Sequence, residues 1–437
     1  GDHQAVADRA PCHRAAETER RHGAILGDRG RCANAPDRRA PASGDSPFVP
    51  VRNRVGRCYP APAVGIPIAL FLLAVVVRLV LVAGFPDPAY PDSFYYVNVA
   101  RELAAGNGFT TDVIWVFPEV GGTIPADPVL PIPSNAHWMP LASIVQVPFI
   151  WLLGPTAVAS ALPFALAVEG AAPVAWLIAR DVGAAGHVAI GAGVLTEVPG
   201  LSAVYMTQPD NFSLYQPLVA GALLLGARGL RGSGRAFAVA GLLAGLATLS
   251  RNDGALVMAA LGLAFLWDRW RAWRSGGPVG VSLAAAAGAV ALFVVAVGPW
   301  PPRQLAVFGQ LSPSTASGKV LFIRDISEWN SITTPASWEH LVGMGWGELL
   351  LTRAGGLVAA VMIFSVLVGA IALVPFMVLG TWRHRRDVAF GPFLAYAGLL
   401  FAFSALVSAV HVPGGTFIHS AVALAPQTND ERRFEVK

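Results

Sequence analysis

Charged residues are scarce in this sequence. Asp, Glu, Lys and Arg make up 13% of the 437 residues, against 54% hydrophobic residues, and the mean hydropathy is +0.54. A soluble domain carries about 25% charged residues. The composition therefore excludes an ordinary soluble protein and predicts an all-α polytopic bundle of transmembrane helices.

Cysteine is scarcer still, with only Cys12, Cys32 and Cys58, all near the N-terminus. Their spacing does not match a metal knuckle, and the apolar body of the chain offers no cysteine to pair with them. The sequence therefore predicts neither a disulfide framework nor a cysteine-bound zinc ion.

The net charge of +4 has a local origin, because residues 1–60 hold eleven arginines against seven acidic residues. The rest of the chain balances, so the basic pI does not indicate a nucleic-acid partner. Residues 1–60 also lack apolar periodicity, and we expect a disordered or non-native tail there. A second charged tail, of native or non-native origin, is expected at 427–437, where a last apolar segment breaks off.

About ten spans are expected within 61–426. The first, 63–85, follows three arginines, which places the N-terminus in the cytoplasm and the loop 86–137 outside. The next apolar segment, 138–154, is short and holds two prolines, and we interpret it as interfacial or half-inserted. This assignment puts the basic clusters that follow in the cytoplasm and the long segment 300–353 outside.

The remaining spans are expected at 156–179, 184–205, 212–227, 236–250, 254–267, 279–299, 355–380, 391–410 and from 416 onward.

Asp92 opens a polar, aromatic segment directly behind the first span. The run "PDSFYYVNVARELAAG" has helical rhythm. Its apolar side is expected to hold Phe94, Val97, Arg101 and Ala104 with the neighbours at 95, 98 and 102, and the helix is expected to end at Gly106 and Gly108. This pattern is typical of a juxtamembrane interfacial helix. Aspartate is a preferred N-cap, so Asp92 could serve only to satisfy free amides, although a cap would also fix the position of its carboxylate.

Other polar residues are expected at the same outer face. Asp210 stands where a span ends and a helix begins, which also suits an N-cap. Arg251 and Asp253 fall between two apolar spans. They could form a tight turn with an ion pair, or they could bind a ligand. Arg303 lies just outside a span, where it could hold a phosphate or serve as an interfacial anchor.

Histidine is the remaining candidate for a ligand or a base. The candidates are His137, His411 and His419, although a lone histidine is more often structural. Together with two carboxylates and arginine, they suit chemistry on a membrane-borne, phosphate-containing substrate. A carboxylate can remove a proton from an acceptor hydroxyl or amine, and a cation can hold the departing phosphate.

Six segments in order resemble the GT-C superfamily of integral-membrane glycosyltransferases, especially its protein O-mannosyltransferase and aminoarabinose-transferase branch. They are "PDSFYYVNVARELAAGNGF", "HWMPLASIVQVPFIWLLGP", "TQPDNFSLYQPL", "GLLAGLATLSRNDGALVM", "GPWPPRQLAVFG" and "GGTFIHSAVALAP". The first segment departs from the family pattern, because Asp92-Ser93 stands where the best-known mannosyltransferases have Asp-Glu.

The resemblance implies a transmembrane bundle with juxtamembrane helices in the first outer loop. It also implies inverting transfer of a sugar from a polyprenyl-phosphate donor to a protein, glycan or lipid acceptor, on the extracytoplasmic face. By position, Asp92 and Asp210 match the family's catalytic acids. His137, Arg251, Asp253 and Arg303 fall in family-like segments as substrate-binding candidates.

No cofactor is required by the residues themselves. The carboxylates could bind a divalent cation, but no ligand spacing demands one. The alternative to a transferase is a transporter or flippase-like carrier of a lipid-linked or small polar solute, in which Glu169 and Glu197 inside the spans would mark the route.

Overall fold

The computed structural model describes residues 65–428 except 86, 116–126, 128, 198–204, 312–316, 332 and 335. The tail expected at 1–60, with its three cysteines, lies outside the described residues, as does nearly all of the tail expected at 427–437.

The described residues form eighteen α-helices and one short hairpin. The first nine helices are α1 (Gly65–Gly84), α2 (Pro91–Ala105), α3 (Leu141–Ile144), α4 (Val147–Leu153), α5 (Ala157–Val168), α6 (Ala171–Asp181), α7 (Gly186–Glu197), α8 (Asn211–Leu230) and α9 (Gly234–Ser250). The other nine are α10 (Ala255–Ser275), α11 (Leu283–Val297), α12 (Trp300–Phe308), α13 (Trp338–Val342), α14 (Trp346–Ile363), α15 (Val374–His384), α16 (Gly391–Leu406), α17 (Phe417–Ala421) and α18 (Ala425–Thr428).

Short irregular helices and two strands complete the described chain. The 3-10 helices are Tyr205–Thr207, Asn252–Gly254, Ser317–Leu321, Ile326–Asn330, Val388–Phe390, Ala409–His411 and Val422–Leu424, and the π-helices are Phe364–Val368 and Val412–Thr416. The strands β1 (Thr110–Thr111) and β2 (Ile132–Pro133) pair antiparallel, with Thr110 opposite Pro133.

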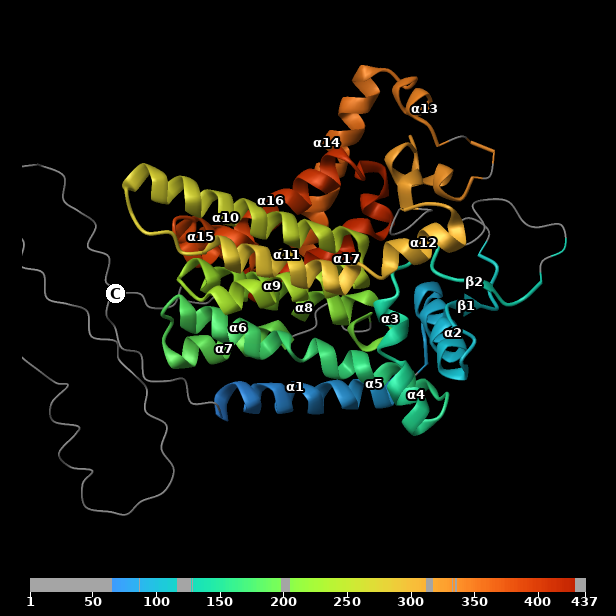
Figure 1. The fold of residues 1–437 in the computed structure, drawn as a ribbon, viewed down its shortest axis with the longest axis horizontal. Coiled ribbons are helices and arrows are strands. Elements are labelled where there is room, and N and C mark those ends of the chain that lie inside the picture. Colours follow the sequence, from blue (N-terminus) through green and yellow to red (C-terminus); the bar gives the residue numbers. More distant parts are fainter. Residues whose placement is uncertain are drawn as a thin grey trace, which may run out of the picture. The chain divides into compact units, whose positions relative to one another are not determined.

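The long helices lie side by side around α8 and α9. Helix α9 packs against α8 on one side and α11 on the other, while α10 packs against α16, and α16 against α14 (Figure 1). The crossing of α9 and α11 is very close at Gly241, where an added Cβ would lie 2.1 Å from the carbonyl oxygen of Ala289. Small residues permit such approaches in membranes, where packing rather than burial from water holds helices together.

The surface of this bundle is apolar along several helices. Within the part of the chain that the structure describes, four helical stretches are long and apolar enough to cross a membrane: Gly65–Gly84, Ala157–Asp181, Leu283–Phe308 and Trp346–Val368. Four shorter apolar helices accompany them among the described residues. Large aliphatic side chains lie exposed along α1, α11 and α14, as lipid-facing surfaces require. The predicted all-α membrane bundle is confirmed, whereas the number of about ten spans stays a prediction.

Segment 138–154, which we interpret as interfacial or half-inserted, folds as the two short helices α3 and α4, and its placement in the membrane stays a prediction. One of the predicted spans has a different form. The prediction of one helical span at 355–380 is wrong. Helix α14 starts earlier, at Trp346, and the helical conformation is interrupted before α15 begins. Ala370 and Ile371 take positive φ values of 41° and 58° at that break. Hydropathy could not reveal it, since both sides of the break are apolar.

The end of the bundle that carries α2 positions the candidate site. Helices α2, α3 and α4 pack together there, next to the hairpin (Figure 1). Helix α2 ends as predicted at Gly106, in a left-handed conformation with φ of 87°. Its buried side matches the predicted one only in part: Tyr95 and Val97 are buried, whereas Phe94 is 58% exposed. Tyr96 and Val99 are buried as well.

Candidate functional site

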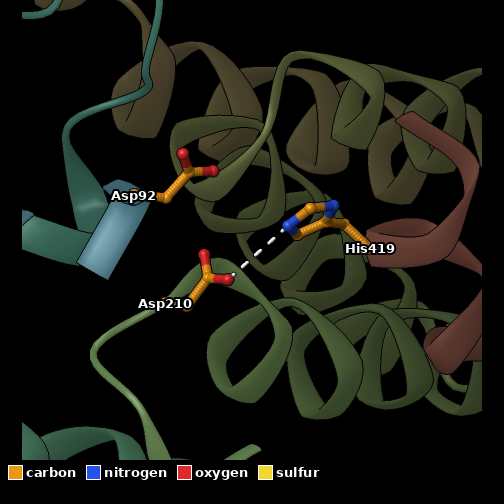
Figure 2. Close-up of side chains that lie close together, drawn as sticks. All are labelled: Asp92, Asp210 and His419. Carbon is orange, nitrogen blue, oxygen red and sulfur yellow. Dashed lines mark ion pairs between the residues drawn. The ribbon is translucent and has the colours of Figure 1, made fainter. Parts of the chain in front are cut away.

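Three side chains from distant parts of the sequence converge at one point. One ligand atom from each of Asp92, Asp210 and His419 lies within 4.8 Å of the other two. Asp92 comes from the start of α2, Asp210 precedes α8, and His419 belongs to α17, and all three point toward one another (Figure 2). We call Asp92, Asp210 and His419 the acid–histidine cluster.

Asp92 lies in the first turn of α2 but is not the N-cap residue of that helix. Tyr90 is the N-cap residue of α2 and makes no side-chain cap hydrogen bond, while Pro91 and Asp92 occupy the first two helical positions. The cap interpretation of Asp92 is therefore wrong. A carboxylate in the first turn is still stabilised by the helix dipole, and this position leaves the carboxylate pointing into the cluster.

Asp210 does cap its helix. Its Oδ1 accepts the backbone N–H of Asn211 at the start of α8, as the sequence indicated. The residue is fully buried, and its Oδ2 has no hydrogen-bond partner among the described residues. One oxygen thus fixes the carboxylate, while the other faces the cluster.

His419 opposes that second oxygen. Its Nε2 lies 3.5 Å from Oδ2 of Asp210, and its ring stacks on Phe212 with centroids 4.1 Å apart. Its Nδ1 lies 2.7 Å from the carbonyl oxygen of Gly415, which can only accept, so Nδ1 carries the proton. In the neutral ring Nε2 is then an acceptor that faces a carboxylate. A positive charge between the two atoms would relieve this repulsion.

Tyr96 borders the cluster from α2. Its hydroxyl accepts a 2.7 Å hydrogen bond from Nδ2 of Asn211, which joins α2 to the start of α8. Burial, and then the nearby Asp92 carboxylate, raise the pKa of Tyr96 well above its ordinary value. The phenol therefore remains protonated. Neither Tyr96 nor Asn211 was singled out from the sequence, although both adjoin residues that were.

Arg251 and Asp253 form the predicted ion pair. Nε of Arg251 lies 3.0 Å from Oδ1 of Asp253, and both side chains are largely buried. Arg251 also donates to Oγ of Ser420 and to the carbonyl oxygen of Thr416, each at 3.1 Å. The turn between α9 and α10 is therefore bound to the segment that carries His419.

His137 lies in a series of aromatic rings that contact one another edge-on or at a tilt. It packs edge-on against Trp138 and Trp329, with centroids 4.8 and 5.3 Å away, and Trp329 packs against His411 at 4.7 Å. Burial, the neighbouring His411 and the charge of Arg251 lower the pKa of His137 to about 3. The imidazole is neutral and weakly basic at neutral pH, so the structure disfavours His137 as a general base.

Arg303 holds the loop that follows α2. Its guanidinium donates to the carbonyl oxygen of Phe109 at 3.2 Å and lies 5.1 Å from the ring of Trp300. The adjacent Gln304 donates to the carbonyl oxygen of Asn135. These contacts fit the interfacial-anchor interpretation.

No family model matches the chain, and no curated protein matches it. Solved structures similar to it include two of the same protein. The first is ArnT from Cupriavidus metallidurans bound to undecaprenyl phosphate, with a TM-score of 0.50 and 18% identity over 83% of this chain. The chain has the fold of ArnT. It spans 59% of that ArnT chain. The second is the apo state of the same ArnT, at a TM-score of 0.38 and 18% identity over 84% of this chain and 77% of that one.

The ArnT-like fold agrees with the GT-C resemblance seen in the sequence. At this level of identity the likeness concerns the arrangement of helices, so the chemistry must be argued from the acid–histidine cluster itself.

Proposed function

We propose that this protein is a glycosyltransferase that moves a sugar, with inversion, from a polyprenyl-phosphate donor to a protein, glycan or lipid acceptor at the extracytoplasmic face. The observation that carries the proposal is the convergence of Asp92 and Asp210 at the starts of α2 and α8. The ArnT-like fold supports it, since that ArnT is bound to undecaprenyl phosphate.

Burial assigns different roles to the two acids. Asp92 is partly exposed, whereas Asp210 is fully buried. Asp92 can therefore reach an acceptor hydroxyl or amine and take its proton as the sugar is transferred. Asp210 cannot reach an acceptor without rearrangement, and its role is to fix the charge and geometry of the site.

The donor phosphate needs positive charge as it departs. Arg251 is already paired with Asp253, and Arg303 holds the loop that follows α2. The acid–histidine cluster offers another source, because two carboxylates and an imidazole from three elements suit a divalent cation. Oδ2 of Asp210 and Nε2 of His419 suit such a cation, because both are buried acceptors. Such a cation, when bound, would neutralise charge on the phosphate.

The transporter alternative depended on acidic residues inside the spans. Glu169 is fully buried, and its Oε1 lies 2.6 Å from Nε of Arg78 on α1. A buried charge that is paired in this way is typical of a structural link between helices. The contact favours the transferase over a transport route past Glu169.

The experiment is a transfer assay with the purified protein in proteoliposomes, using radiolabelled sugar on undecaprenyl phosphate. A panel of pentose and hexose donors, with lipid and peptide acceptors, identifies the substrates. We expect product from at least one pair, and product with inverted anomeric configuration. Binding of undecaprenyl phosphate without transfer from any donor would instead favour a carrier.

A further inference from the structure

We propose that Arg251, Asp253, Thr416 and Ser420 form a latch that sets the position of His419 against Asp210. Arg251 is then a positioning residue rather than a ligand of the donor phosphate. The consequence for catalysis rests on the proposed function, whereas the positional claim stands on the contacts alone.

The contacts of Arg251 all lead to the segment that carries His419. The guanidinium reaches Ser420 through Nε and the carbonyl oxygen of Thr416 through Nη2. The hydroxyl of Ser420 in turn donates to Oδ2 of Asp253. One ion pair therefore binds a residue on each side of His419 in the sequence.

Helix α17 has only five residues and lies between the π-helix Val412–Thr416 and the 3-10 helix Val422–Leu424, so the helical backbone there is irregular. Short helical segments have little stability of their own, so tertiary contacts must fix the position of this one. The preceding Gly415 has a φ of 119°, a backbone conformation that side-chain-bearing residues rarely adopt. Its carbonyl oxygen accepts from Nδ1 of His419. The latch thus holds the chain on both sides of the imidazole, and the Gly415 carbonyl orients the ring.

The same contacts argue against phosphate binding by Arg251. Its Nε and Nη2 both donate to Asp253, at 3.0 and 3.4 Å, which is the face that a bidentate phosphate contact would use. The side chain is only 14% exposed, and its guanidinium carbon lies 5.9 Å from the ring centre of Tyr215. To hold a phosphate through this face, Arg251 would have to leave Asp253 buried and unpaired, which is costly.

Cross-linking measures the position of His419 directly. Cysteines replace Asp210 and His419 in a full-length background whose three native cysteines are serines, and a short bis-thiol reagent joins them. We expect Ser420→Ala and Arg251→Lys to slow this cross-link about fivefold, the scale of one lost hydrogen bond. Unchanged rates in both variants would overturn the latch.

Two controls separate the latch from general loss of folding. A second cysteine pair replaces Asp181 on α6 and Arg228 on α8. In the native protein, Nε of Arg228 lies 2.7 Å from Oδ2 of Asp181. Its cross-linking rate should be the same with and without Ser420→Ala. The matched serine is Ser404, which is buried in α16 with no hydrogen-bond partner for its hydroxyl among the described residues. Ser404→Ala should leave both cross-links unchanged.

Binding and turnover then test the role of Arg251. We expect Ser420→Ala and Arg251→Lys to lower kcat about fivefold and to leave the Kd for undecaprenyl phosphate within about twofold of wild type, since neither variant removes a ligand contact. In a His419→Gln background the two substitutions should lower kcat no further.

If Arg251→Lys raised the Kd for undecaprenyl phosphate about tenfold or more and Ser420→Ala did not, Arg251 would be a phosphate ligand. That result would overturn the inference. If the wild-type protein transfers no sugar, the proposed function fails, and the cross-linking rates still decide whether the latch exists.

Discussion

Nε2 of His419 lies 3.5 Å from Oδ2 of Asp210, and each atom is buried without a hydrogen-bond partner among the described residues. Because the other nitrogen of the ring donates to Gly415, two acceptors face each other when the imidazole is neutral. Asp92 adds a second carboxylate nearby. Such an arrangement is stable when a positive charge lies among the three groups, and this requirement leads to the first prediction.

Chelation should lower activity. We expect dialysis against EDTA to reduce sugar transfer about tenfold or more, and added Mn²⁺ or Mg²⁺ to restore it, because a divalent cation would neutralise the carboxylates. His419→Gln should raise the Mn²⁺ concentration that gives half-maximal activity. Activity that survives exhaustive chelation would show that a proton, rather than a cation, supplies the charge.

Two substitutions of Asp210 should separate the effect of its charge on transfer from the effect of its helix cap on stability. Asp210→Asn keeps an oxygen for the N–H of Asn211 but loses the charge, so we expect transfer to fall about 100-fold with little change in thermal stability. Asp210→Ala also loses the cap and should destabilise the protein by about 1 kcal/mol further. Thermal unfolding in detergent and the transfer assay measure the two effects. Equal activity in Asp210→Asn and wild type would remove Asp210 from the site.

The Arg78–Glu169 pair should be structural. Arg78→Ala leaves the buried Glu169 carboxylate without its partner at 2.6 Å, and we expect destabilisation of about 3–5 kcal/mol. The double variant Arg78→Met with Glu169→Gln should recover most of that loss, because it buries no unpaired charge. Recovered stability combined with full transfer activity would confirm the structural role. Loss of activity in a stable double variant would indicate a functional one.

His137 should affect stability in acid. Its pKa in the folded protein is lowered to about 3, mainly by burial, so between about pH 3 and its ordinary value of about 6.5 the unfolded chain binds the extra proton. Stability should therefore fall as the pH drops through this window, and His137→Asn should make the fall shallower. Thermal unfolding from pH 7 to pH 4 measures it. Parallel curves for variant and wild type would contradict the lowered pKa.

The sequence was informative where the signal is local. Hydropathy and charge predicted the helical membrane bundle, and the helix start at "PDNFSLY" predicted the cap formed by Asp210. The Arg251–Asp253 ion pair also follows from two residues in one turn.

Other features depend on contacts between distant segments. His419 was one of three candidate histidines, and no local pattern connects it with Asp210; only the packing of α17 against α8 does. The buried side of α2 was only partly predicted, because Tyr96 packs within the protein, whereas Phe94 is exposed. The contacts of Ser420 with the Arg251 turn were likewise invisible in the sequence.

The transfer rate of Asp92→Asn tests the central claim most directly. Asparagine retains the size of the side chain but is no base, so we expect kcat to fall about 100-fold or more, with the unfolding temperature close to wild type. Ser404→Ala, measured beside it, should transfer at the wild-type rate. A folded Asp92→Asn protein that transfers sugar at the wild-type rate would contradict the proposed role of Asp92.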